Sequence, residues 1–344
     1  MRRILVSLSS TLVAIMLACG VGALLILLFT DSDPVLAFWS LIQAAFGNTY
    51  GFTETLGKAI PLLLISLGLI IAFRCRIFNV GAEGQLYMGA IVAGWIGAFW
   101  HGLPGPLYLP LILLASVLCG AMWAAIPGIL KAKARVNEIV TCLMLNYIAM
   151  HLAGFLAVGP LRDPEISGLG AQTPNIVPSA ALPPLIAQTR LHAGVFLAIF
   201  LTFLSYLFMW KTGLGFRIRA TGANPDASKH AGIGVSKNIV LVMAISGGLA
   251  GLAGMVEVLG IHHCLLIGMS ANYGYLAILV ALLGKLQIVG VVIASVMFAG
   301  LIVGGDGMQQ FAMVPAALVY VIQGLTVLFV ICADALLVRG AVTR

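Results

Sequence analysis

The chain has 344 residues, of which 61% are hydrophobic and 8% are charged, and its formal net charge is +7. Soluble domains carry about a quarter charged residues, and a soluble fold of this size could not cover so much apolar surface. Composition therefore excludes a soluble protein and predicts a polytopic membrane protein. Long unbroken apolar runs favour membrane-spanning helices over an outer-membrane barrel.

The surplus of basic residues does not indicate a nucleic-acid partner. No basic face remains once the apolar runs are set aside, so the positive-inside rule explains the charge better. The six cysteines form no C-x-x-C pair, and most of them lie inside apolar runs. That pattern is typical of small buried side chains, and the sequence predicts neither a disulfide framework nor a metal site.

The first predicted element is a membrane span over 4–29, which follows Arg2 and Arg3. The pentapeptide "MLACG" at 16–20 resembles a lipoprotein cleavage site, but the apolar run continues to Phe29. A retained first span is therefore the better interpretation.

Nine further spans of about 20 residues or fewer are expected along the chain. They lie at 59–73, 79–100, 107–130, 138–159, 193–210, 238–261, 273–284, 288–305 and 313–336. Outer connectors at 30–58 and 160–192 and a polar stretch at 211–237 separate some of these spans. The sequence thus predicts an all-α membrane protein with about ten transmembrane helices in a single domain, 1–344.

The distribution of charge orients these spans. With both termini in the cytoplasm, only Lys58, Arg162 and Arg190 of the 18 basic residues fall on the outer side. Shifting the count by one span destroys this asymmetry, so both ends are expected inside. The short spans 59–73 and 273–284 leave room for broken or re-entrant helices.

Polar side chains within apolar sequence mark function or tight pairing by default, because their burial in lipid is unfavourable. The stretch "RIFNVGAEGQLYMGA", 76–90, places Asn79, Glu83 and Gln85 beside several glycines. We expect Asn79 to cap a helix that begins at Val80, with Glu83 near its N-terminus, where the helix dipole favours an anion.

Two interpretations of this stretch remain open. It is either a discontinuous helix that lines a transport pathway, or a cytoplasmic loop in which Arg74 and Arg76 interact with Glu83. The two interpretations differ in how deeply Glu83 is buried.

Two other spans carry candidate pathway residues. Thr141, Asn146 and Tyr147 lie in "VNEIVTCLMLNY" and serve either hydrogen bonding between helices or the pathway. Glu257 shares a helix face with small residues in "GGLAGLAGMVEVLG", so it is expected to point into protein as a structural partner or a pathway residue. The glycines there lack the strand that a nucleotide-binding loop requires.

The stretch "GGDGMQQF", 304–311, is expected on the outer side. It is either a solvated turn or a contact for a binding protein or cargo. His262 and His263 also fall near the outer side, but adjacent histidines on a helix point apart and no third ligand is suitably spaced.

A short helix is predicted inside the polar stretch "GFRIRATGANPDASKHAGIGVSKN". Asn224 is a good N-cap, Pro225 suits the first helical position, and Gly232 can end the helix in a left-handed conformation. Asp226 lies in the first turn, and Lys229 with His230 in the last, as the helix dipole favours. A helix of about seven residues is not stable alone, so it is either an ordinary connector or a helix that docks on a partner.

Several blocks together resemble the permease subunits of ABC importers, in the branch that carries simple sugars and nucleosides. They are "FRCRIFNVGAEGQLYMGA", "VNEIVTCLMLNYIA", "GFRIRATGANPDASKHAGIGVSKNIVLVMAISGGLAGLAG", "LAILVALLGKLQIVGVVIASVMFAGLIVGG" and "VIQGLTVLFVICAD". The resemblance covers most of the chain in order. One departure is "GKLQIVG", where this branch usually carries a proline in the loop.

The resemblance implies a type II ABC-importer-like permease fold in a bacterial cytoplasmic membrane. It implies two permease subunits in the lipid bilayer, alike or related, with two ATPase subunits below them and an extracytoplasmic substrate-binding protein. ATP and Mg²⁺ would bind to the ATPases, and no cofactor to this chain. The segment 222–232 would be the coupling helix that fits the ATPase. Its residues of interest are Gly222, Asn224, Pro225, Asp226, Ala227, Lys229 and Gly232.

The rival function is a stand-alone secondary transporter, in which Glu83 and Glu257 could relay protons. The predicted docking helix favours the ABC permease, because a self-sufficient carrier needs no ATPase dock. No catalytic or nucleotide-hydrolysing motif is present, so we do not expect an enzyme.

Overall fold

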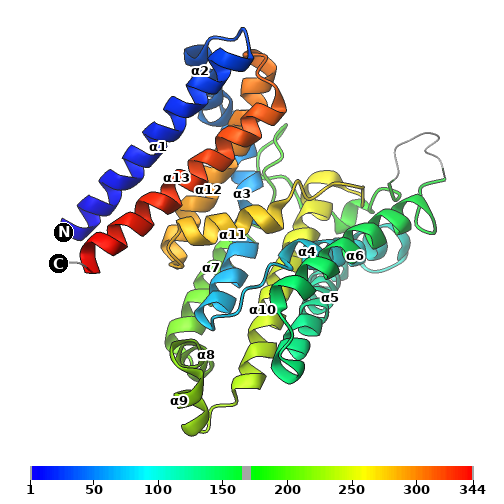
Figure 1. Cartoon of the computed structure of the whole chain (residues 1–344). Helices are drawn as coiled ribbons and strands as arrows, with labels where there is room; N and C mark the ends of the chain where they lie inside the picture. The colour runs from blue at the N-terminus through cyan, green and yellow to red at the C-terminus, as the bar shows by residue number, and fades with distance from the viewer. Residues whose placement is uncertain (1, 165–171, 343–344) are drawn as a thin grey trace. The chain divides into compact units, whose positions relative to one another are not determined.

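The computed structural model describes residues 2–164 and 172–342, and the regular structure of these residues is helical (Figure 1). The α-helices are α1 (Arg2–Phe29), α2 (Pro34–Phe46), α3 (Thr49–Arg74), α4 (Ala82–Phe99), α5 (Gly105–Ala134), α6 (Glu138–Val158), α7 (Gly194–Lys211), α8 (Gly213–Ala223), α9 (Pro225–His230), α10 (Val235–Glu257), α11 (Tyr273–Leu283), α12 (Ile288–Phe311) and α13 (Ala316–Val342). A short 3₁₀ turn, η1 (Pro178–Ala180), precedes α7, and a π-helix, η2 (Val258–His262), continues α10. The predicted all-α class is confirmed.

The chain forms two compact units, which we describe separately. The central unit comprises residues 57–295, and the terminal unit comprises residues 1–56 and 296–344. The expectation of one functional domain over the whole chain stays a prediction.

Helix α10 is the core of the central unit. It packs against α4 and α5, which also pack against each other. Every residue from Ser246 to Glu257 is buried. Small residues permit this close approach: a Cβ on Gly251 would overlap the Ser116 carbonyl oxygen of α5, and one on Gly89 of α4 would overlap the backbone of Gly251. The predicted small-residue packing face is therefore confirmed.

Helices α5, α6 and α7 expose apolar side chains. On α5, Leu114, Leu118 and Met122 recur at every fourth position and are each more than half exposed. Their spacing places them on one helix face. An apolar face of this kind suits lipid or another membrane protein.

In the terminal unit, α1 packs along α13 and also contacts α2. The unit has its own apolar core. Its buried residues are Ile26, Ala37, Met308, Ala312, Val314, Val319 and Ile322.

The predicted spans coincide with helices, but their number is not confirmed. In the described parts of the chain, six helices are long and apolar enough to cross a membrane: α3, α5, α6, α7, α10 with η2, and α12. Shorter apolar stretches lie at Met16–Phe29, Pro34–Phe46, Tyr273–Leu283 and Ala316–Val330. The coarser prediction of a multi-pass helical membrane protein holds.

The bounds of the predicted outer connector 30–58 are wrong, and its place on the outer side stays a prediction. Most of it is helical, because Asp33 begins α2 by accepting a hydrogen bond from the Val35 N–H at 2.9 Å, with Pro34 at the first helical position. Asp33 and Pro34 together are a helix start signal. The second predicted span is also too short, since α3 already begins at Thr49.

Of the two interpretations of 304–311, the solvated turn is wrong, because α12 continues to Phe311. The contact with a binding protein or cargo stays a prediction. Its glycines serve helix packing. A Cβ on Gly304 would press on Leu41 of α2, and one on Gly307 would overlap Ala44. Small residues of this kind let helices in a membrane approach each other closely.

Candidate functional site

Residues 75–81 form a non-helical break between α3 and α4, in which Arg76 is exposed and Asn79 is buried. Helix α4 begins at Ala82, with Gly81 as N-cap and without a side-chain cap. The prediction that it begins at Val80 under a cap from Asn79 is therefore wrong by two residues. Asn79 Oδ1 instead accepts the Gly81 N–H at 3.0 Å and so ties the break together.

Glu83 lies in the first turn of α4, as predicted, and only 1% of it is exposed. The Ser270 hydroxyl donates to Glu83 Oε1, and the Gly274 N–H donates to Oε2 at 2.7 Å. Gly274 belongs to the first turn of α11. The carboxylate thus satisfies buried donors at the start of that helix, where a negative group is stabilised.

The interpretation of Glu83 as a loop residue that interacts with Arg74 and Arg76 is wrong, because Glu83 is buried in the first turn of α4. Arg74 does not pair with Glu83: it donates to the Leu286 carbonyl at 2.9 Å and lies 5.6 Å from the ring centroid of Trp210. The groups that donate hydrogen bonds to Glu83 are the Ser270 hydroxyl and the Gly274 N–H, and not the expected arginines.

Asn79 and Gln85 form a reciprocal pair of amides. Asn79 Nδ2 donates to Gln85 Oε1 at 2.8 Å, and Gln85 Nε2 donates back to Asn79 Oδ1 at 2.9 Å. Asn79 Nδ2 also donates to Ser246 Oγ of α10 at 2.8 Å. Since all three side chains are at most 1% exposed, this pairing removes the penalty for burying unpaired amides.

Asn146 of α6 joins the same region. Its Oδ1 accepts the Gly84 N–H at 2.9 Å, and its Nδ2 donates to the Val80 carbonyl at 2.9 Å and to Tyr275 Oη at 3.0 Å. Asn146 therefore links the start of α4 to both α6 and α11.

These contacts define one feature, which we call the polar junction. Its residues are Asn79, Glu83, Gln85, Asn146, Ser246, Ser270 and Tyr275. They join α4 to α6, α10 and α11, so a movement of any of these helices past α4 must break buried hydrogen bonds.

Sequence reasoning found four members of the junction and missed Ser246, Ser270 and Tyr275. Ser270 lies 187 residues from Glu83 in the chain. No local pattern indicates such a pairing. The one available signal was the general rule that a buried carboxylate needs donors.

Three other predicted pathway residues lie outside the polar junction. Thr141 Oγ1 donates to the carbonyls of Asn137 and Glu138 in its own helix, both at 3.1 Å. Tyr147 is 56% exposed. Glu257 is buried at the C-terminal end of α10, where its Oε2 lies 3.3 Å from His262 Nε2.

The predicted short helix exists as α9. Asn224 Oδ1 accepts the N–H groups of Asp226 and Ala227 at 3.0 and 3.1 Å. Gly232 follows the helix with φ +76°, and the Ile233 N–H bonds the Ser228 carbonyl at 2.9 Å. This is the glycine-closed C-terminus that the sequence predicts.

Helix α9 is held between longer helices. Ser228 is its one buried residue, and the other five are exposed. Behind it, α8 approaches the end of α3 so closely that a Cβ on Gly222 would overlap the Arg74 carbonyl. Asn238 of α10 donates to Thr221 Oγ1 of α8 at 2.8 Å. The α8–α9–α10 segment therefore presents a six-residue helix that could not persist alone.

Comparison with known proteins identifies relatives along most of the chain. Residues 51–331 match the family described as branched-chain amino acid transport system / permease component. The glucose ABC transporter permease TsgB13 of Haloferax volcanii is 36% identical, over 92% of this chain and 85% of its own length.

Two bacterial relatives have nucleosides in their names. The guanosine ABC transporter permease NupP of Bacillus subtilis is 36% identical, over 94% of this chain and 93% of its own length. The nucleoside ABC transporter permease NupB of Lactococcus lactis is 31% identical, over 93% of this chain and 89% of its own length. No solved structure matches the chain.

Proposed function

The chain belongs to the branched-chain-type permease family and is the membrane-spanning subunit of an ABC importer, and we propose that its cargo is a nucleoside or a simple sugar. It is a transport subunit and not an enzyme. The observation that carries the cargo proposal is the 36% identity to both a guanosine and a glucose permease. Both named cargoes are polar, neutral ring compounds, and a pathway with few buried charges fits them.

We further propose that the polar junction gates the transport pathway. Asn79, Glu83, Gln85 and Asn146 tie the start of α4 to three neighbouring helices. An alternating-access cycle requires helices to move relative to one another. Buried hydrogen bonds that have two discrete arrangements suit that movement better than a continuous apolar contact. Thr141, Tyr147 and Glu257 stay predictions as pathway residues.

The coupling role is proposed for the segment 222–232, with α9 at its centre. The exposed face of α9 and its two well-made ends support this role, because a docking helix must keep its shape while it transmits force. Among its residues, Asp226, Ala227 and Lys229 offer exposed side chains to a partner.

The assembly follows from the family but is itself a proposal. It would contain two ATPase subunits that bind ATP and Mg²⁺, a second permease subunit and an extracytoplasmic binding protein. This chain would bind no cofactor. We place it in a cytoplasmic membrane with ten spans in a type II importer-like fold and with both termini in the cytoplasm, as the positive-inside rule favours.

The alternative of a stand-alone secondary transporter has no support from the relatives, whose names identify ABC permeases. Of its two proposed proton-relay carboxylates, Glu83 accepts hydrogen bonds at the polar junction and Glu257 pairs with His262.

An uptake competition assay tests the cargo proposal. Cells that depend on this permease are given labelled guanosine or labelled glucose, each against an excess of unlabelled nucleosides, hexoses and pentoses. We expect one of the two labels to enter and only its own chemical class to compete. If neither label enters while a charged amino acid does, the cargo proposal is wrong although the family assignment stands.

A further inference from the structure

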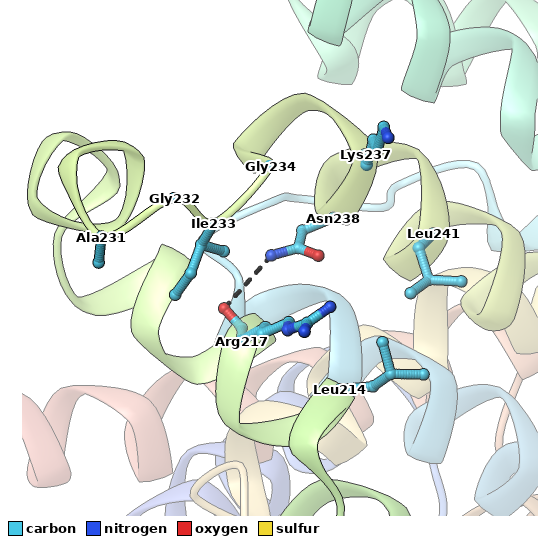
Figure 2. A pocket seen from close by; sticks show the side chains of 9 residues that line it. All are labelled: Leu214, Arg217, Ala231, Gly232, Ile233, Gly234, Lys237, Asn238 and Leu241. Atoms are coloured by element: carbon cyan, nitrogen blue, oxygen red, sulfur yellow. Dashed lines mark hydrogen bonds between the residues drawn. The ribbon is translucent and has the colours of Figure 1, made fainter.

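A pocket of about 360 Å³ opens between α8 and the start of α10 (Figure 2). Its lining comes from three places: the first turns of α8, the turn that follows α9, and the first turns of α10. A volume of this order is sufficient for a small-molecule group.

The two helices contribute matching pairs of side chains. On α8, Leu214 and Arg217 are three residues apart, and on α10, Lys237 and Leu241 are four apart. Residues at these spacings share one face of a helix. Each wall of the pocket therefore combines one cation with one leucine, and Ile233 adds a further apolar side chain.

The positive charge of this pocket is not balanced by the protein. Its lining contains Arg217 and Lys237 and no acidic residue. By contrast, the nearby Arg219 lies 4.6 Å from the ring centroid of Trp210, and Lys131 pairs with Glu138 at 2.7 Å. Within the described residues, no salt bridge is formed by the side chains of Arg217 and Lys237.

The position of the pocket along the chain places it at a membrane surface. The apolar helix α7 ends at Lys211, directly before α8, and the apolar helix α10 begins at Val235. Both helices are candidate membrane spans, so the residues at these two ends lie where hydrocarbon gives way to headgroups.

We propose that this pocket binds the phosphate of an anionic phospholipid. Arg217 and Lys237 pair with the phosphodiester, and Leu214 and Leu241 contact the first part of the acyl chains. Lysine and arginine near a membrane surface attract anionic lipids, and basic pockets between membrane helices bind their headgroups. A bound lipid would join α8 to α10 and so brace the segment that holds α9.

Lipid titration of the purified full-length chain in detergent tests this inference without cargo or ATP. Native mass spectrometry counts the lipids that remain bound when phosphatidylglycerol or phosphatidylcholine is added. We expect the wild-type chain to retain phosphatidylglycerol in preference to phosphatidylcholine. The double variant R217Q/K237Q should bind phosphatidylglycerol at least about tenfold more weakly.

The matched control is K133Q/K211Q, which removes the same charge from residues that do not line the pocket. It should retain phosphatidylglycerol like the wild type. Equal loss in both double variants, or equal retention of both lipids by the wild type, would overturn the proposal. Displacement of phosphatidylglycerol by millimolar inorganic phosphate would also overturn it, since the site would then select free phosphate rather than a lipid.

A second measurement separates the lipid from a protein occupant. Bound phosphatidylglycerol is counted again after the ATPase partner is added. Retention of the lipid supports the proposal, whereas its loss would assign the pocket to the ATPase interface. Failure of cargo transport has no effect on either readout, so this inference and the proposed function fail independently.

Discussion

At the scale of single residues, Glu83 carries the most specific prediction. Replacing it by Gln exchanges one acceptor oxygen for an NH₂ group that faces a hydroxyl or an N–H donor. We expect Glu83→Gln to lower the stability of the chain by roughly 1–3 kcal/mol and to reduce uptake at least about tenfold. Thermal unfolding in detergent and initial uptake rates measure the two effects.

Ser270 supplies the matched control for Glu83. Ser270→Ala removes one donor and leaves the Gly274 N–H in place. The double variant with Glu83→Gln should lose less than the sum of the single losses, because the two groups share a contact. Unchanged uptake and unchanged unfolding in Glu83→Gln would exclude a gating role for the carboxylate.

His192 predicts a dependence of stability on pH. It lies in the connector before α7, where Nδ1 accepts the Gly194 N–H at 3.1 Å. Burial, and to a smaller extent the nearby His263, lower the pKa of its imidazole from 6.5 to about 4. The unfolded chain therefore binds more protons between these two values. The contribution of neutral His192 to the free energy of unfolding is fully present above about pH 6.5. It declines as the pH falls towards 4, by up to about 3 kcal/mol.

His192→Asn tests this dependence, because an amide oxygen can accept the Gly194 N–H and does not titrate. We expect the unfolding temperature of the variant to fall less than that of the wild type between pH 7 and pH 4.5. Parallel curves would show that His192 does not carry the effect.

The sequence indicates which polar residues are candidates for the site, but it does not indicate their hydrogen-bond partners. Asn79, Glu83 and Asn146 stand out because each interrupts apolar sequence. Their partners Ser246, Ser270 and Tyr275 are ordinary residues in sequence, distant in the chain, and only the packing of α4 against α6, α10 and α11 selects them.

At the scale of helices, the contact of α10 with α4 and α5 depends on glycine. A methyl group at Gly251 would overlap the Ser116 carbonyl oxygen. We expect Gly251→Ala to destabilise the chain by about 1–3 kcal/mol, as overpacking does. The control is Gly20→Ala in α1, where a Cβ meets no atom within 4 Å. In thermal unfolding in detergent, we expect a lower midpoint for Gly251→Ala than for the wild type, and an unchanged midpoint for Gly20→Ala. Equal midpoints for the two variants would contradict the packing account.

The second prediction at this scale concerns α9. Asn224→Ala removes a side chain that caps two N–H groups and should cost about 1 kcal/mol of helix stability. Ala227→Asp instead places a charge on the exposed face of α9 without removing the cap. We expect both variants to insert normally and to reduce ATP-driven uptake, with the larger loss in Ala227→Asp if its face docks on the ATPase. Normal uptake in both variants would remove the coupling assignment.

Helix boundaries show where sequence reasoning succeeds and where it does not. The ends of α9 were predictable, because capping signals act locally through Asn224 and Gly232. The start of α2 and the end of α12 were not predicted: 30–58 was assigned to a connector, and the last span before 313 was ended at residue 305. At the start of α2, the deciding interaction is the hydrogen bond from the Val35 N–H to Asp33. At the end of α12, it is the contact of Gly304 and Gly307 with α2.

At the scale of the whole molecule, the predicted orientation can be tested directly. In a chain whose cysteines are replaced by serine, Ser179→Cys reports on the connector before α7 and Ala231→Cys reports on the end of α9. Both positions are exposed. A membrane-impermeant maleimide applied to intact cells should label Ser179→Cys alone. Labelling of Ala231→Cys from outside would reverse the topology.

ATP-dependent uptake in a reconstituted system tests the central claim most directly. The chain is assembled in proteoliposomes with its ATPase, permease and binding-protein partners, and uptake of labelled nucleoside or sugar is measured with and without ATP. We predict uptake only when ATP is hydrolysed and the binding protein is present. Uptake of the same cargo by this chain without ATP, driven by a proton or sodium gradient, would contradict the account.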